Sequence, residues 1–143
     1  MKPAERLPVL AAALWWGSLT AVGFVVVPLL FRHLPTPAVA GAMAARLFTA
    51  QSWIALACGF LLIVLARGRE STATMDWAGG ALRFIAAGML LALLLEFAVA
   101  PRILARQNLP LWHGLGSAML LLQWVCAGVV LWKVAALRSA APS

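Results

Sequence analysis

The chain has 143 residues, of which 64% are hydrophobic and only 10% are charged, and its mean hydropathy is +0.98. A soluble domain carries about 25% charged residues, so this composition excludes a water-exposed globule and indicates an integral membrane protein. The net charge of +7 does not indicate nucleic-acid binding, because the basic residues flank apolar runs, where they act as topology signals and headgroup contacts.

Four apolar runs are long enough to cross a bilayer, whose core of about 30 Å needs roughly 20 helical residues. We predict crossings at residues 7–31, 47–66, 78–100 and 111–132. So little sequence remains outside them that residues 1–143 should form a single transmembrane domain. The predicted fold class is therefore all-α, a polytopic membrane protein built as a bundle of four transmembrane helices.

The first run follows Lys2 and Arg6, as in a secretory signal, but it exceeds the roughly 7–15 apolar residues of such signals. We therefore expect a retained anchor. Beyond this run, Thr36-Pro37 combines an N-cap with a proline in the first turn. We predict a short interfacial helix over residues 36–46, joined to the second crossing by a bend at Gly41.

The ends of the first and third runs are similar. The first ends Phe24-Val-Val-Val-Pro28 and the third ends Phe97-Ala-Val-Ala-Pro101. Each is followed by a basic residue, a short loop and another helix, which suggests two hairpins in the same orientation. Pro101 is predicted to end or kink the third helix, because proline removes a backbone donor and crowds the preceding turn.

Small residues recur at four-residue spacing in two of the runs. Without a hydrophobic force between helices in lipid, such residues allow the close backbone approach that holds helices together. The predicted interior faces are Ala13, Gly17 and Ala21 in the first helix, and Gly88, Ala92 and Ala100 in the third. Gly17, Gly88 and Ala92 are the predicted helix-packing positions. Gln123, within the fourth run, is predicted to form an interhelical hydrogen bond.

Glu96 lies inside the third run, on the same face as Gly88 and Ala92. An ionisable group there costs several kcal/mol unless it is partnered or hydrated. One interpretation is an interhelical ion pair or hydrogen bond that fixes packing, with arginines such as Arg46 available on the same predicted side. Another is an ion or proton site, and a third is a side chain that faces lipid and extends toward the headgroups.

His113 opens the fourth helix, and Ser117 follows one turn later on the same face. The predicted topology places His113 at about the level of Glu96, so the two could relay a proton. Alternatively, His113 donates to a carbonyl or a lipid headgroup. The candidate polar site comprises Glu96, His113, Arg46 and Ser117.

Both histidines of the chain, His33 and His113, belong to the same predicted membrane face, which leaves a haem or a copper site formally open. However, His33 lies in a loop that ends at Pro35, a poor platform for a rigid axial ligand. Metal-ligand spacings such as CxxC and HxxxH are absent from the sequence, as are a nucleophile–base pair and a phosphate-binding glycine loop. We expect no cofactor, no metal and no enzymatic activity.

The distribution of basic residues predicts the orientation, because Lys and Arg favour the cytoplasmic side. Four arginines belong to one side, namely Arg32, Arg46, Arg102 and Arg106. Seven basic residues belong to the other, which also holds both termini: Lys2, Arg6, Arg67, Arg69, Arg83, Lys133 and Arg138. We therefore predict that both termini are cytoplasmic, in a multi-pass protein of the bacterial inner membrane.

One stretch resembles the signature of the transmembrane protein 205-like family, through Pro28-Leu-Leu-Phe31-Arg-His-Leu34, Ala40-Gly41 and Leu47-Phe48. That family also has a proline after its third helix and a histidine-glycine at the start of its fourth, matched here by Pro101 and His113-Gly114. Where the family tends to have serine and asparagine further along the fourth helix, this chain has Gly116 and Leu120. The resemblance implies a four-helix membrane protein of unassigned activity.

We predict an accessory, scaffold or assembly component of the membrane, which associates with itself or with a larger membrane protein and binds no nucleic acid. The alternative is a small proton- or ion-coupled transporter that uses Glu96 and His113. The third hypothesis is a haem- or metal-binding redox protein.

Overall fold

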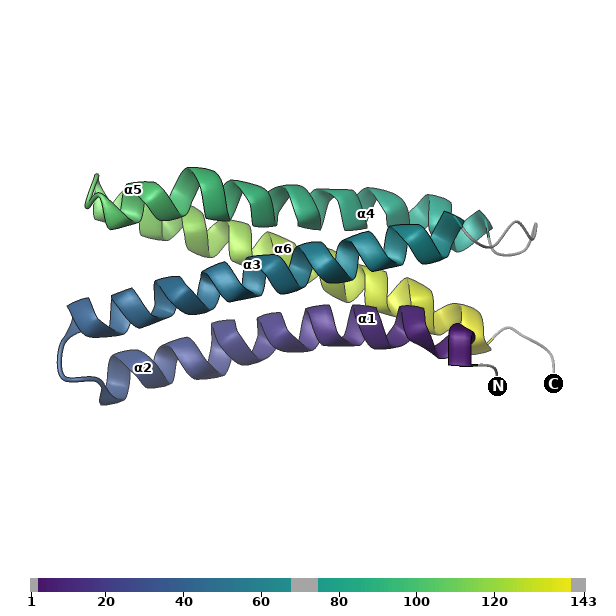
Figure 1. Ribbon diagram of the computed structural model, residues 1–143, viewed down its shortest axis with the longest axis horizontal. Coiled ribbons are helices and arrows are strands. Elements are labelled where there is room, and N and C mark those ends of the chain that lie inside the picture. Colours follow the sequence, from purple (N-terminus) through teal and green to yellow (C-terminus); the bar gives the residue numbers. More distant parts are fainter. Residues whose placement is uncertain (1–2, 68–74, 140–143) are drawn as a thin grey trace.

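A computed structural model describes residues 3–67 and 75–139, and every secondary-structure element in these two ranges is helical (Figure 1). The elements in chain order are α1 (Pro3–Thr20), the π-helical segment η1 (Ala21–Val26), α2 (Val27–His33), α3 (Pro37–Arg67), α4 (Met75–Leu94), the π-helical segment η2 (Leu95–Val99), α5 (Ala100–Leu104) and α6 (Leu109–Ser139). The predicted all-α fold class is confirmed.

The elements form four rods, because α1, η1 and α2 are continuous with one another, as are α4, η2 and α5. Each rod contains a segment long and apolar enough to span a membrane: Arg6–His33, Pro37–Arg67, Gly80–Leu104 and Leu109–Ala136. The predicted crossings all fall on these rods. Successive rods run in opposite directions, so the start of α1 and the end of α6 lie at the same end of the bundle (Figure 1).

The structure corrects the prediction of a separate interfacial helix. Thr36 caps the helix as expected, since its Oγ1 accepts a hydrogen bond from the Val39 N–H at 3.3 Å. However, α3 then continues without a break through Gly41 to Arg67, a length of 31 residues or about 46 Å. Ala40 and Ala44 in its first turns are buried in the bundle, and this packing favours one continuous helix over a bend at Gly41.

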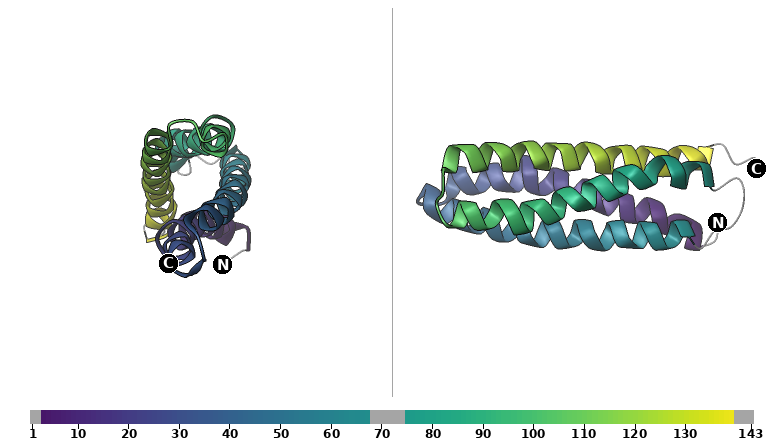
Figure 2. Two further views of the ribbon diagram at one scale, coloured as in Figure 1. Left: turned by 90° about the vertical axis from the view of Figure 1, so that its left-hand side faces the viewer. Right: turned by 90° about the horizontal axis from the view of Figure 1, so that it is seen from above.

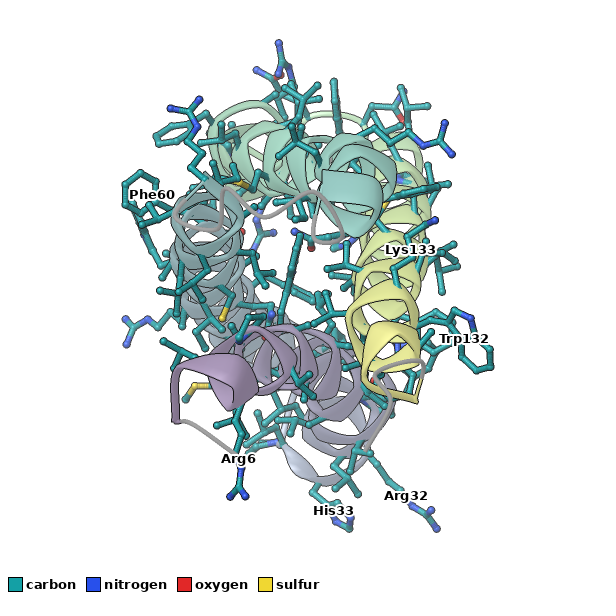
Figure 3. All side chains as sticks on the ribbon, turned by 90° about the vertical axis from the view of Figure 1, so that its right-hand side faces the viewer. Arg6, Arg32, His33, Phe60, Trp132 and Lys133 are labelled. Carbon is teal, nitrogen blue, oxygen red and sulfur yellow. The ribbon has the colours of Figure 1, made fainter. Side chains whose placement is uncertain are left out.

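The four rods form a ring in which α1 packs on α3 and α6, and α4 packs on α3 and α6 (Figure 2). The largest fully buried apolar side chains are Trp15, Leu19, Leu62, Ile85 and Val130, contributed by all four rods. Phe60 and Trp132 point away from the bundle axis, as lipid-facing side chains do (Figure 3).

Gly88 permits the closest approach in this core. A Cβ at Gly88 would lie 2.6 Å from Cζ2 of Trp15, too close for any residue other than glycine without a shift of the indole. Trp15 is fully buried, and so is Ala92, one turn beyond Gly88. The small-residue face of α4 therefore lies inside the bundle.

The small-residue face of α1 lies on the outside of the bundle, and the prediction of an interior face is wrong. Ala13 and Ala21 are exposed, and a Cβ at Gly17 would have no neighbour within 4 Å. The interior face of α1 instead carries Trp15 and Leu19. Four-residue spacing defines a face but not its direction, and here the indole of Trp15 fills the space that Gly88 leaves open on the facing helix.

The two π-helical segments have the same relation to proline. Pro28 is the second residue after η1, and Pro101 is the second residue after η2. Each proline lacks the N–H that would bond to the carbonyl of Phe24 or Phe97, and its ring crowds that carbonyl. A wider π turn relieves this crowding, so the third rod does not end at Pro101 but continues to Leu104.

Candidate functional site

A cavity of about 240 Å³ lies between the rods at the end of the bundle where α2 and α5 terminate. Its walls come from α2, the first half of α3, η2 with α5, and the start of α6. Most of the lining is aliphatic, aromatic or glycine. Its polar side chains are Ser52, Glu96, His113 and Ser117.

Glu96 reaches this cavity from η2 and is partly buried. Its Oε1 accepts a hydrogen bond from the hydroxyl of Thr49 on α3 at 3.2 Å, which joins the second rod to the third. The partner of Glu96 in the structure is therefore a neutral hydroxyl group. Of the three predicted interpretations, an interhelical hydrogen bond is present, and the carboxylate also lines the cavity.

Three arginines at this end of the bundle are bonded elsewhere or lie outside the cavity. The Arg102 guanidinium donates to the Ala98 carbonyl at 2.6 Å and stacks 4.6 Å from the ring centre of Trp112. Arg46 is exposed and does not line the cavity, although its neighbours Ala44 and Ala45 do. Arg32 points away from the bundle (Figure 3). The structure thus separates Arg46 from the other predicted site residues.

His113 and Ser117 line the cavity from one face of α6. Both are exposed, as is Phe31 on α2, so the cavity opens between α2 and α6. The contacts between helices agree with an opening at this place, because α2 packs mainly on α3 while α5 packs on α6. In a membrane this opening faces the lipid near the headgroups, because it lies close to the end of the bundle.

Next to the cavity, toward the middle of the bundle, neutral polar side chains connect the helices. Gln51 is 2% exposed, and its Nε2 donates to Ser18 Oγ at 3.0 Å. Gln123 is 1% exposed, and its Nε2 donates to the Gly88 carbonyl at 3.1 Å, which confirms the predicted interhelical bond. Sequence reasoning missed Gln51 and Thr49. An amide within an apolar run was the available signal for Gln51, as it was for Gln123.

The two histidines considered for haem or metal binding do not come together. His33 ends α2, points away from the bundle in Figure 3 and does not line the cavity that His113 lines. Cys58 is buried in the core and Cys126 is partly buried, and both are free thiols. Among the side chains of residues 6–67 and 80–136 there is no group of three or more His, Cys, Asp and Glu that could hold a metal ion.

The fold and the cavity define a four-helix membrane protein with a carboxylate at the edge of an apolar space. Residues 10–110, most of the chain, match the family model described as a domain of unknown function, DUF4149, so the protein belongs to this family. The matched range includes Glu96 and ends before His113 and Ser117. Comparisons with curated proteins and with solved structures give no match.

Proposed function

We propose that this protein is a non-enzymatic binding or carrier protein that takes a small, largely apolar molecule into the cavity beside Glu96. The cavity itself is the observation that carries this proposal. A dry cavity of about 150 Å³ binds benzene, so about 240 Å³ suffices for a molecule of about ten non-hydrogen atoms. Ligand sites have this character, with apolar walls and a few polar groups that fix orientation.

The surroundings of the cavity support binding from the lipid side. The opening between α2 and α6 faces the bilayer, whereas Trp15, Ile85 and Val130 fill the rest of the bundle. Glu96 and His113 line the same space, as the transporter hypothesis requires. A molecule dissolved in the membrane could enter without crossing the packed core.

Two glycines provide a matched test of this proposal. Gly41 lines the cavity and Gly114 does not, yet a Cβ at either position would have no neighbour within 4 Å. We expect Gly41→Leu to weaken binding of 4-phenylbutanol at least about tenfold by filling the cavity, and Gly114→Leu to leave it unchanged. Binding is measured by calorimetry in lipid nanodiscs, with empty nanodiscs as the blank. Equal affinity in the two variants contradicts the proposal.

A second candidate is the accessory or scaffold role, which the outward face of α1 favours. Gly17 lies there in open space, beside the exposed Leu10 and Leu14. This surface would accept the backbone of another helix, since small residues permit close approach in lipid. We expect Gly17→Leu to lower self-association, measured by energy transfer between labelled copies in liposomes. If association is absent or unchanged in the variant, this surface has no such role.

We also propose that the chain is a bacterial inner-membrane relative of the transmembrane protein 205-like family, with both termini in the cytoplasm. Its Pro28–Leu34 motif and the excess of basic residues on the terminal side support this proposal. A reporter enzyme that functions only in the cytoplasm should be active when it is fused to the C-terminus, and a reporter that functions only in the periplasm should be inactive there. Activity of a periplasmic reporter at that position contradicts the orientation.

A further inference from the structure

We infer that the ligand of this cavity is a small organic amine, whose ammonium group binds Glu96 while its apolar body occupies the cavity. This inference rests on the proposed function and adds the chemical class of the ligand. It follows from the charges around the cavity, the incomplete partnering of Glu96 and the position of the opening.

The charges favour a cation over an anion. Among the described residues that line the cavity, Glu96 is the one acid and His113 the one basic residue. No described arginine lines the cavity: Arg102 bonds to the Ala98 carbonyl and stacks on Trp112, and Arg32, Arg46 and Arg106 lie outside the lining. A carboxylate ligand would therefore meet Glu96 without a fixed positive charge to offset the repulsion.

Glu96 retains capacity for a charged partner. A carboxylate offers about four acceptor positions, and among the described residues Glu96 accepts one hydrogen bond, from the neutral hydroxyl of Thr49. An ionised group within an apolar segment is costly unless it is partnered or hydrated. An ammonium group supplies the opposite charge together with N–H donors, and such charge-assisted bonds are about twice as strong as neutral ones.

The packing of the bundle does not require an acid at this position. Glu96 lies five residues before Pro101, and the residue five before Pro28 in the equivalent π-helical segment is Gly23. Gly23 faces α6, where a Cβ would lie 3.3 Å from Leu120. The same π-helical turn therefore forms without a carboxylate, so the turn does not by itself account for the acid at position 96.

The opening between α2 and α6 matches how amphiphilic amines sit in a bilayer. Their charged group stays near the headgroups and their apolar body lies among the acyl chains. The exposed Phe31 borders the opening, and an aromatic face attracts ammonium groups. Entry from the lipid would thus carry the ammonium past Phe31 to Glu96 without crossing the core.

Three ligands with one phenylbutyl body separate charge from shape: 4-phenylbutylamine, 4-phenylbutanol and 4-phenylbutyrate. We expect the native protein in nanodiscs to bind the amine about tenfold to a hundredfold more tightly than the alcohol, and the carboxylate most weakly. Affinities are corrected for partitioning into empty nanodiscs. Glu96→Gln should remove the preference, so that the ratio of amine affinity to alcohol affinity falls to about one.

The outcomes distinguish this inference from the proposed function. If amine and alcohol bind the native protein equally and both are lost in Gly41→Leu, the cavity binds ligands but the amine inference is overturned. If Gly41→Leu and Gly114→Leu bind all three compounds alike, the proposed function itself fails. If Glu96→Gln does not fold, Glu96→Asp replaces it, because aspartate keeps the charge on a shorter side chain. The preference of the native protein for the amine over the alcohol then still tests the amine inference.

Discussion

The two halves of the molecule share a backbone plan but differ at a few side chains. Each half has a long helix, a π-helical segment, a proline two residues later and a second long helix. Thirteen residues before the proline, the first half has Trp15 and the second has Gly88, and these two residues pack against each other. Five residues before the proline, the halves have Gly23 and Glu96.

This comparison shows how a repeated framework becomes asymmetric. At Trp15 and Gly88 a large residue fills the space that a small one leaves, so the difference between the halves stabilises the core. At Gly23 and Glu96 the difference affects the candidate site, because only the second half places a carboxylate in the lining of the cavity. Packing and the candidate site thus depend on different pairs of equivalent positions.

The largest effect is expected when the Trp15–Gly88 pair is broken. Gly88→Leu would force a side chain into the indole of Trp15. Overpacking of a core typically costs about 1–3 kcal/mol, and we expect a loss of about 3 kcal/mol for so large a side chain at so close a contact. Unfolding in mixed micelles measures the loss of stability. The matched control is Gly17→Leu, which faces open space and should cost almost nothing. Similar losses in both variants would contradict the packing described for Gly88.

A smaller effect is expected from the prolines. Pro101→Ala restores an N–H that can bond to the Phe97 carbonyl, so η2 can return to a regular α-helix. Closing a π turn shifts the register by one residue, about 100° of rotation, and turns Glu96 away from the cavity. We expect the preference for 4-phenylbutylamine over 4-phenylbutanol to fall about tenfold, or 1.4 kcal/mol.

Pro28→Ala is the control for this change, because η1 carries Gly23 at the position of Glu96. Its amine preference should remain that of the native protein. If both variants lose the preference equally, the π-helical segments act on the whole bundle, and the particular placement of Glu96 is not the cause.

Most of the fold was predictable from the sequence. In lipid every backbone polar group must be bonded internally, so apolar runs of bilayer length become helices. The directions of the faces were not predictable in the same way. Ala13, Gly17 and Ala21 have the same spacing as Gly88 and Ala92, yet only the α4 residues face inward, since the direction depends on which residue lies opposite.

The candidate site was predictable in part for a similar reason. Glu96, His113 and Ser117 stand out as polar groups at one level, and all three line the cavity. Arg46 shares that level, but it follows the lining residue Ala45 directly and therefore lies about 100° away around the helix. The hydroxyl of Thr49 gives only a weak signal in an apolar sequence, because a neutral group in a helix has many possible partners.

The smallest expected effect concerns the bond that joins the two halves at the site. Thr49→Val keeps the shape of the side chain and removes the hydroxyl that donates to Glu96 at 3.2 Å. Interhelical hydrogen bonds in membrane proteins contribute about 0.6 kcal/mol on average, so stability should fall by about that amount, whereas Thr49→Ser should retain most of it. In a double-mutant cycle with Glu96→Ala, the two losses should not add. Additive losses would mean that the bond does not stabilise the bundle, and that Glu96 is held at the cavity by the geometry of η2 alone.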